Sequence, residues 1–235
     1  MRDLAGGGGV GGGRAGRALF LVPHMDDEAI SCGGAIRHHL RRGDAVCVQP
    51  VYCRSHGLGD SETRAEYGSF LRSVAELVKP DLPAIETPVD PIFAKASEPE
   101  HVGYAAVLQV VERALSEQRP NFVYGPTSSD LNQDHRKLSE IINIALRPWN
   151  APAGGFRYAQ FFGYPPDVGR ANLFIEMSES DVRAKNAAMA CYQRETRSTP
   201  HVRSPEKLRD FCSWCGALAG VPYAEPYALK MLREV

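Results

Sequence analysis

The sequence predicts a single α/β domain with a mostly parallel sheet and helices on both of its faces. Apolar runs of strand length alternate with longer segments whose apolar residues recur at helical spacing. This alternation is typical of parallel strands joined by helical crossovers. The length of 235 residues, with 43% hydrophobic and 23% charged residues, is suited to one folded domain, and no internal repeat or long linker divides it.

The first three elements are expected to be a strand, a helix and a second strand. Residues 18–24 form an uninterrupted apolar run, which is typical of a strand buried on both faces. Residues 28–43 carry a helical pattern that ends at Gly43, and the basic stretch within it is expected to form a solvated helix face. Residues 44–53 are the second strand, in which Pro50 marks the end or a bulge.

The middle of the chain continues the alternation. Apolar residues at helical spacing predict helices over residues 61–78 and 102–118, with a short strand candidate at 84–90 between them. Residues 121–127 are a third apolar run of strand length. The helix that follows, over residues 134–148, stops at a proline, which disfavours helical geometry in the residue before it.

The two ends of the chain complete the domain organisation. Residues 1–17 are rich in glycine, so we expect a flexible tail rather than a phosphate-binding loop, which should follow a strand. Residues 18–235 are expected to form one Rossmann-like domain. Its last elements are predicted to be two strands and two helices, at residues 156–165, 172–178, 181–194 and 205–218.

Composition argues against several classes of partner and location. The net charge is −1, so the chain as a whole is not a basic binder of nucleic acid or of a membrane surface. No apolar run approaches the roughly 20 residues of a membrane span. The six cysteines form no dense framework and no signal peptide precedes them. Reduced thiols and a cytoplasmic location are therefore expected.

Two groups of polar residues follow strands of the predicted sheet. His24, Asp26 and Asp27 stand where the first strand ends, and the segment SSDLNQDHR, residues 128–136, follows the strand at 121–127. In open α/β sheets, sites lie at the carboxyl ends of the strands. Imidazole and carboxylate groups that converge there predict a divalent-metal site, because the cation offsets the negative charge.

Spacing assigns a role to each of these residues. His24 and Asp27 are three positions apart in a tight turn, so both reach one point, and His135 completes a set of three zinc ligands. Asp26 lies between two ligands but points elsewhere, where it can take a proton from water. Zinc lowers the pKa of a bound water from about 15.7 to about 7, so a carboxylate is a sufficient base.

These motifs resemble those of the PIG-L/LmbE-like zinc-dependent N-deacetylases. The family's first motif, (A/P)-H-x-D-D, is matched by residues 23–27, and the second, which ends in D-H, is matched by Asp134 and His135. The sequence YAEPY at residues 223–227 is similar to the family's C-terminal pattern. The resemblance covers the chain from about residue 18 to its end, and it implies the same three zinc ligands with Asp26 as general base.

The resemblance further implies that an N-acetyl group, mostly on an amino sugar, is removed as acetate. Many members have a histidine where this chain has Asn132. An asparagine amide can hydrogen-bond an oxyanion but cannot donate a proton at neutral pH. Two routes for the acid stay open, because either Asp26 passes its proton to the leaving amine or His201 reaches the site. We favour Asp26.

Four other residues are candidates for supporting roles. Asp130 and Asp134 flank His135, and either can orient a ligating imidazole, with Asp134 favoured by its match to the motif. The resemblance implies a sugar-binding arginine near Arg64 and an aspartate for substrate hydroxyls near Asp90. The alternatives are an exposed helix arginine and a turn residue between prolines.

Three functions are considered, in this order. The first is a zinc-dependent deacetylase acting on a small N-acetylated sugar or sugar conjugate. The second is an amidase or deacylase acting on another N-acyl natural product or thiol conjugate. The third is a Rossmann-like nucleotide-binding module without catalysis. This module is disfavoured because its Gly-rich turn should follow the first strand, where PHMDDE stands instead.

Overall fold

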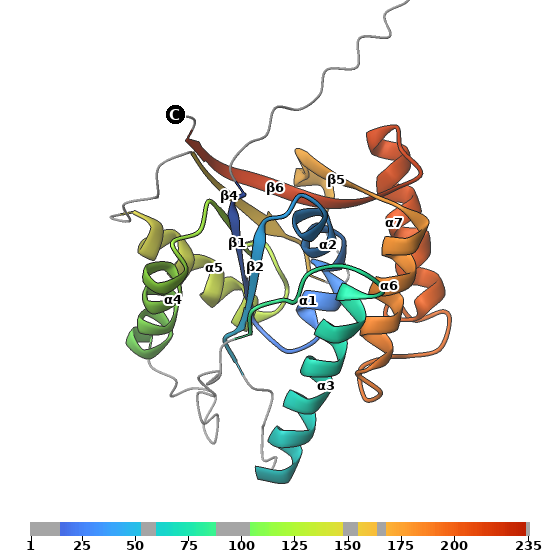
Figure 1. The fold of residues 1–235 in the computed structure, drawn as a ribbon, viewed down its shortest axis with the longest axis horizontal. Coiled ribbons are helices and arrows are strands. Elements are labelled where there is room, and N and C mark those ends of the chain that lie inside the picture. The colour runs from blue at the N-terminus through green and yellow to red at the C-terminus, as the bar shows by residue number, and fades with distance from the viewer. Residues whose placement is uncertain (1–14, 53–59, 88–103, 148–154, 164–167, 234–235) are drawn as a thin grey trace, which may run out of the picture.

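One mixed sheet of six strands forms the centre of the structure (Figure 1). The structure is a computed structural model and describes residues 15–52, 60–87, 104–147, 155–163 and 168–233. The strands are β1 (Arg17–Val22), β2 (Ala45–Pro50), β3 (Phe122–Pro126), β4 (Phe156–Phe161), β5 (Leu173–Met177) and β6 (Tyr223–Arg233). Their spatial order is β2-β1-β3-β4-β6-β5. The first four of these pair in parallel and β6 runs antiparallel to both neighbours, which confirms the predicted α/β class.

Helices cover both faces of this sheet, as the sequence predicts. In Figure 1, α4 and α5 lie on one side of the strands and the other helices lie on the opposite side. A short 3₁₀ helix, Val168–Arg170, precedes β5. The α-helices are α1 (Asp27–Ile30), α2 (Gly33–Arg41), α3 (Asp60–Val78), α4 (Tyr104–Gln118), α5 (Gln133–Leu146), α6 (Glu179–Ala190) and α7 (Pro205–Ala219).

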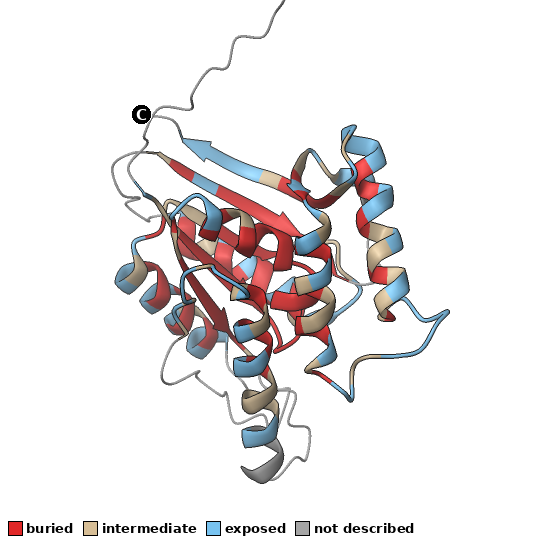
Figure 2. Ribbon diagram, turned by 45° about the vertical axis from the view of Figure 1, so that its right-hand side comes forward, coloured by how far each residue is buried: buried red, intermediate tan, exposed pale blue. Residues whose placement is uncertain are grey.

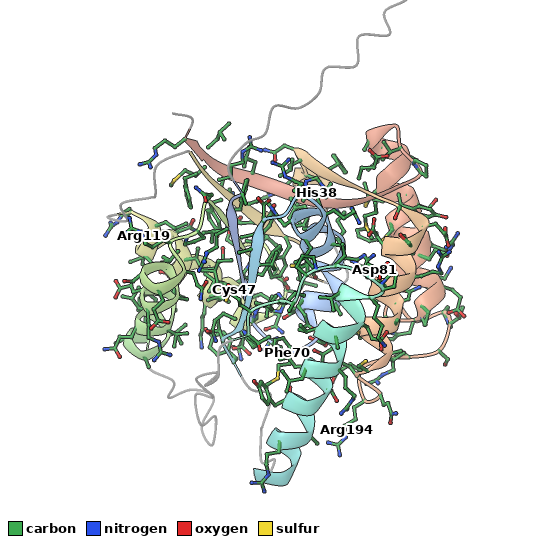
Figure 3. All side chains as sticks on the ribbon, viewed as in Figure 1. His38, Cys47, Phe70, Asp81, Arg119 and Arg194 are labelled. Atoms are coloured by element: carbon green, nitrogen blue, oxygen red, sulfur yellow. The ribbon has the colours of Figure 1, made fainter. Side chains whose placement is uncertain are left out.

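Alternation along β1 divides the core into two layers. Leu19 and Leu21 belong to the buried cluster under α4 and α5, whereas Phe20 and Val22 belong to the cluster under α2, α3 and α6. Successive side chains of a strand point to opposite faces, so an apolar run without alternation fits a strand covered on both sides. Figure 2 shows the buried sheet between helices with exposed outer faces, and Figure 3 shows the side chains that fill both layers.

The helix expected over residues 28–43 is instead two helices, α1 and α2. The break lies where Glu225 of β6 accepts hydrogen bonds from the backbone N–H groups of Gly34 (2.8 Å) and Ala35 (2.9 Å). A carboxylate at a helix N-terminus accepts hydrogen bonds from the first N–H groups and interacts favourably with the helix dipole. A Cβ on Gly34 would lie 2.7 Å from Sδ of Met177 and 2.9 Å from the carboxyl carbon of Glu225, so a larger residue here would displace these side chains. Buried Lys185 of α6 pairs with the same carboxylate.

The C-terminal segment forms β6, a strand that the sequence analysis did not predict. Pro226 argues against an inner strand, because proline lacks the N–H that a sheet ladder needs. The pairing with β4 stops at Tyr227, opposite Phe161, so Pro226 lies beyond the last of these pairs. Because β6 is antiparallel, its first residues lie at the edge of the sheet where β1, β3 and β4 end.

Two smaller expectations also need correction. The strand candidate at 84–90 is reduced to an isolated bridge between Glu86 and Cys47, and residues 88–90 lie outside the described part of the chain. The basic stretch over residues 37–42 is only partly a solvated face, because Arg37 and His39 are buried whereas Arg41 and Arg42 are exposed. Arg37 donates to Asp181 and to the carbonyl of Leu77, which holds α2 against α6 and α3.

The remaining expectations concern the tail, the membrane and the cysteines. The sheet begins at Arg17, one residue before the predicted domain, and the rest of the expected tail up to residue 14 is outside the described residues. Within the described ranges, every helix is too short or too polar to cross a membrane. The cysteines that the structure describes are free thiols, as Cys32, Cys47, Cys191, Cys212 and Cys215.

Candidate metal centre and active site

The candidate site lies at the point in the sheet where the order of the strands reverses. The chain passes from β1 to β2 on one side, and β3 later pairs with β1 on the other side. Such a switch point leaves a crevice outside the carboxyl ends of the two strands. The loop after β1 carries His24, Asp26 and Asp27, and the loop after β3 carries residues 128–132 into the start of α5.

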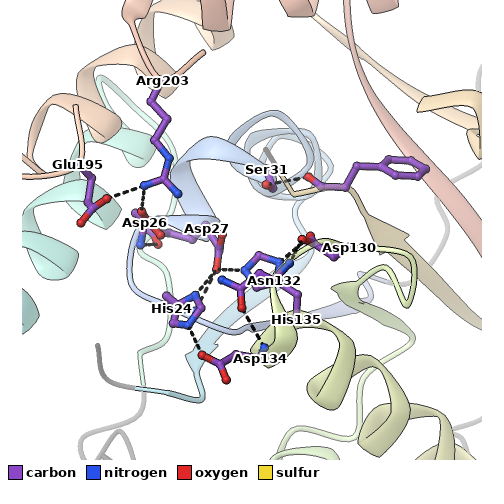
Figure 4. Close-up of polar contacts among 12 residues, drawn as sticks. His24, Asp26, Asp27, Ser31, Asp130, Asn132, Asp134, His135, Glu195 and Arg203 are labelled. Carbon is purple, nitrogen blue, oxygen red and sulfur yellow. Dashed lines mark hydrogen bonds and ion pairs between the residues drawn. The ribbon is translucent and has the colours of Figure 1, made fainter. Parts of the chain in front are cut away.

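His24, Asp27 and His135 meet in this crevice and could hold a metal ion. Their donor atoms lie within 4.8 Å of one another, and all three residues are buried. The Oδ2 atom of Asp27 is 3.4 Å from Nδ1 of His24 and 3.3 Å from Nε2 of His135 (Figure 4). The same oxygen accepts the backbone N–H of His24 at 3.0 Å, which closes the turn. The structure thus brings together the three predicted ligands.

Each of the two imidazoles also contacts a carboxylate through its other nitrogen. Nε2 of His24 lies 3.1 Å from Asp134, and Nδ1 of His135 lies 2.9 Å from Asp130. An imidazole that donates its N–H to a carboxylate presents a lone pair on the other nitrogen, as a metal ligand requires. The two aspartates that precede His135 in the sequence therefore contact different imidazoles. Asp134 contacts His24, and Asp130 contacts His135.

Electrostatics tie these groups together even without a cation. Burial raises the pKa of Asp27. The charge of His135 and hydrogen bonds from both imidazoles together outweigh burial and hold this pKa well below its usual range. Burial lowers the pKa of His135, but Asp27 and Asp130 outweigh burial and raise this pKa to about 10. A charged His135 thus neutralises the carboxylates that a dication would otherwise neutralise.

Asp26 adopts an unusual backbone conformation beside the metal ligands. Its φ is +136°, a left-handed value that costs free energy for any residue with a side chain. Its N–H donates to Oε2 of Glu28 at 3.0 Å, and its carbonyl accepts from Ala29 and Ile30 at the start of α1. The residue is fully buried. Figure 4 shows its carboxylate directed toward Arg203, with a distance of 3.2 Å to Nη1.

Glu28 supports the turn from behind. Its Oε1 atom accepts hydrogen bonds from the hydroxyls of Ser73 on α3 and Tyr192 after α6, while Oε2 holds the backbone of Asp26. Burial raises the pKa of this carboxyl to about 7, against the lowering effect of these hydrogen bonds. Helices distant in sequence thus hold the first motif in place.

Arg203 and Glu195 are the residues that sequence reasoning missed. Both come from the segment between α6 and α7, and Nη1 of Arg203 lies 2.5 Å from Glu195 as well as near Asp26. The spacing of the two residues matches no motif, and 177 positions separate Asp26 from Arg203. No signal in the sequence could have found this contact.

The other predicted residues lie in different places. Asn132 caps α5, with its Oδ1 accepting the N–H of Asp134 at 2.9 Å, and Figure 4 shows its amide beside the ligand cluster. His201 is exposed, and its ring accepts the backbone N–H of Arg203 at 3.1 Å. Among the described residues, no contact joins His201 to the ligand cluster. Arg64 is exposed on α3, and Asp90 lies outside the described residues.

A cavity of about 480 Å³ lies next to this site, between α3 and the end of α6. It touches the first motif through Met25 and the Arg203 pair through Glu195. Its walls combine charged, polar and apolar side chains, including Ser69, Arg72 and Gln193. Such a mixture can hydrogen-bond a polar molecule and still pack against its apolar faces.

The fold and these side chains define an α/β protein with a candidate two-histidine, one-aspartate metal centre at the switch point of its sheet. Residues 19–146 match the protein family described as GlcNAc-PI de-N-acetylase, or PIG-L. The chain belongs to this family, which confirms the resemblance seen in its sequence. A comparison with curated proteins gave no match.

Solved structures with different activities share the fold. The N,N′-diacetylchitobiose deacetylase of Pyrococcus horikoshii has a TM-score of 0.61 and 17% identity, over 92% of this chain and 84% of that one. The hydratase GalB of Pseudomonas putida KT2440, which acts on 4-carboxy-2-hydroxymuconate, has a TM-score of 0.68 and 17% identity, over 94% and 98%. A zinc-inhibited form of teicoplanin deacetylase has a TM-score of 0.63 and 14% identity, over 91% and 98%. These identities establish a common fold alone.

Proposed function

We propose that this protein is a zinc-dependent hydrolase that removes an N-acetyl group from an amino sugar or a sugar conjugate and releases acetate. The observation that carries the proposal is the meeting of His24, Asp27 and His135 beside Asp26 in a member of the PIG-L family. The similarity to a chitobiose deacetylase supports a small N-acetylated sugar as substrate. The free thiols of the described cysteines support the proposed cytoplasmic location.

The donor set fits zinc. Catalytic zinc sites commonly use three protein ligands from histidine and acidic residues and keep one position open. Nδ1 of His24 and Nε2 of His135 face Asp27, so these nitrogens would be the ligand atoms. Asp134 and Asp130 would hold the two rings in the required tautomers. When bound, zinc would polarise the amide carbonyl and make a water molecule more acidic.

The chain's own residues would move the protons. Asp26 would accept a proton from the water that attacks the acetyl carbon. As the C–N bond breaks, the same carboxyl would give this proton to the leaving amine, so that acetate and a free amine are formed. The amide of Asn132 would donate a hydrogen bond to the oxyanion. The exposed position of His201 favours Asp26 over that histidine as the acid.

The amine portion of the substrate is proposed to occupy the cavity lined by Met25, the neighbour of Asp26 in the chain, and by Glu195. A volume of about 480 Å³ is within the range of small-ligand pockets. Arg72 and Ser69 of α3 line it and could bind hydroxyl groups, whereas Arg64 and Asp90 stay proposed substrate contacts from the resemblance. The mixed lining of the cavity is compatible with more than one kind of substituent on the amine. An N-acyl substrate other than a sugar is therefore the second candidate.

The test is hydrolysis by protein purified without chelator and loaded with zinc. Acetate and free amine are measured with N-acetylglucosamine, its disaccharides and glycoconjugates, and with a matched panel of other N-acyl amines. The proposal predicts release from the sugar panel that a chelator stops and zinc restores. Release from the second panel alone would favour the amidase or deacylase. Protein that is purified without bound metal and hydrolyses neither panel after zinc is added would point to a module without catalysis.

A further inference from the structure

Asp26 is held at both of its ends by residues that have no proposed role in binding metal. Glu28 accepts its backbone N–H at 3.0 Å, and Arg203 contacts its carboxylate at 3.2 Å. The φ of +136° between these two contacts is one that an aspartate does not adopt without support. The backbone contact fixes the turn, but the direction of the carboxylate depends on what lies around the side chain.

The contact from Arg203 is suited to setting this direction. The side chain of Asp26 is 1% exposed and that of Arg203 is 24% exposed, so the pair is shielded from most solvent. Nη1 of Arg203 lies between two carboxylates, those of Asp26 and Glu195. A guanidinium is planar and has its donors in fixed directions, so a second carboxylate restricts where the first can bind.

The direction of this carboxylate matters more here than in a site with a separate acid. Asn132 cannot donate a proton at neutral pH, so the proposed function uses Asp26 for both proton transfers. A general base must reach the proton it takes at about 2.6–3.2 Å, and a misplacement of about 1 Å can cost about 100-fold in rate. If the Asp26 carboxylate could adopt a second rotamer, it would spend less time in the direction that proton transfer requires.

We propose that Arg203 is the positioning residue of Asp26 and that Glu195 holds the guanidinium of Arg203 in place. The inference rests on the proposed function in one respect, namely that Asp26 carries the protons. Arg203 acts through Asp26 and does not touch the substrate. The segment between α6 and α7 therefore belongs to the active site, although it contributes no metal ligand.

The first experiment measures what Arg203 contributes. Zinc-loaded Arg203→Met and Arg203→Lys are compared with Arg183→Met, in which an exposed arginine of α6 loses its ion pair with Glu179. We expect kcat to fall about 10- to 100-fold in Arg203→Met, with KM and zinc content within about twofold of wild type. Arg203→Lys should recover part of the loss, because it keeps the positive charge but not the planar guanidinium. Arg183→Met should match wild type.

A second measurement separates positioning from other roles. In an Asp26→Asn background, Arg203→Met should cause no further loss of kcat, because the group that it positions can no longer take a proton. An equal loss in both backgrounds would show that Arg203 acts on the substrate directly and would overturn the inference. Loss of zinc or of thermal stability in proportion to the loss of kcat would show a purely structural role and would also overturn it.

A crystal structure of zinc-loaded Arg203→Met tests the inference without any assay. We expect the carboxylate of Asp26 to rotate from its wild-type direction. An unchanged direction would show that Arg203 does not position Asp26. If Arg203→Met does not fold, Glu195→Gln releases the guanidinium more gently and should give the same rotation to a smaller degree. A wild-type protein that hydrolyses no N-acyl substrate would contradict the proposed function, while the rotation of Asp26 would still decide the inference.

Discussion

Nε2 of His24 lies 3.1 Å from Oδ2 of Asp134, although 110 positions separate the two residues. This contact leaves Nδ1 of His24 facing Asp27. It therefore joins the two motif loops and also selects which nitrogen of the first histidine is available to a cation. The hydrogen bond from His24 is the largest effect on the pKa of Asp134, which it lowers.

Removal of this partner should weaken metal binding. In Asp134→Ala, His24 loses the acceptor for its N–H, so the ring is free to turn and to change tautomer. We expect zinc affinity to fall about 10- to 100-fold, as is usual for partners that orient a ligating imidazole. Competition with a chromophoric chelator measures the affinity. Asp81→Ala changes an exposed aspartate distant from the motif loops and is the control. Equal affinities for the two variants would contradict the assignment.

Replacement of Asp26 should separate chemistry from metal binding. Asp26→Asn keeps the size of the side chain but removes its ability to take a proton. Because Asp26 is not among the three clustered ligands, we expect zinc content to be unchanged. The loss of a general base is expected to lower kcat by about 10²- to 10⁴-fold. Elemental analysis and acetate release measure the two quantities. Full activity, or loss of zinc, would show that this role is assigned to the wrong carboxylate.

Gly163 is predicted to leave the space that Asp130 needs in order to contact the imidazole of His135. A Cβ at this position would lie 2.0 Å from Oδ2 of Asp130, the oxygen that contacts His135. Gly163→Ala should therefore displace Asp130 and weaken zinc binding about 10-fold or more. Gly68→Ala is the matched control, because its Cβ meets only an ordinary contact at 3.4 Å from Arg72. Wild-type zinc affinity in Gly163→Ala would mean that Asp130 does not need its present position.

Zinc binding should release a proton at mildly alkaline pH. The pKa of His135 is raised to about 10 without a cation, whereas a ligating imidazole must be neutral. At pH 8 we therefore expect wild type to release about one more proton per zinc bound than His135→Ala, measured with an indicator dye in weak buffer. Any proton lost by the zinc-bound water is released in both proteins and cancels in this difference. Equal release from the two proteins would show that His135 is already neutral before zinc binds.

The same shift predicts how stability changes with pH in the metal-free protein. A histidine whose pKa is raised by folding contributes stability that is complete below its unfolded value of about 6.5. This contribution is lost as the pH rises through about 10. The melting temperature of metal-free protein should therefore fall between about pH 6.5 and 10 more steeply than that of zinc-loaded protein. Parallel curves for the two forms would exclude the effect.

The local sequence was enough to predict the strands that end at the site and the ligand cluster that follows them. Apolar runs specify β1 and β3 locally, and a parallel sheet places the residues that follow both strands at one edge. His24, Asp27 and His135 could therefore be predicted to meet, although their flanking loops are far apart in the chain. The family resemblance gave the same residues through motifs that are themselves short and local.

The surroundings of that cluster depend on contacts between residues that are far apart in the chain. Arg203 contacts Asp26 across 177 positions, and Glu225 caps α2 across 191, so neither pairing leaves a periodic pattern in the sequence. Pro226 conceals β6 because its local signal opposes a strand, while the position beyond the last pair with β4 tolerates it. Local propensity specifies elements and the loops that follow them. The direction of a buried charged side chain is specified by whichever distant partner reaches it, because an unpaired buried charge is too costly to persist.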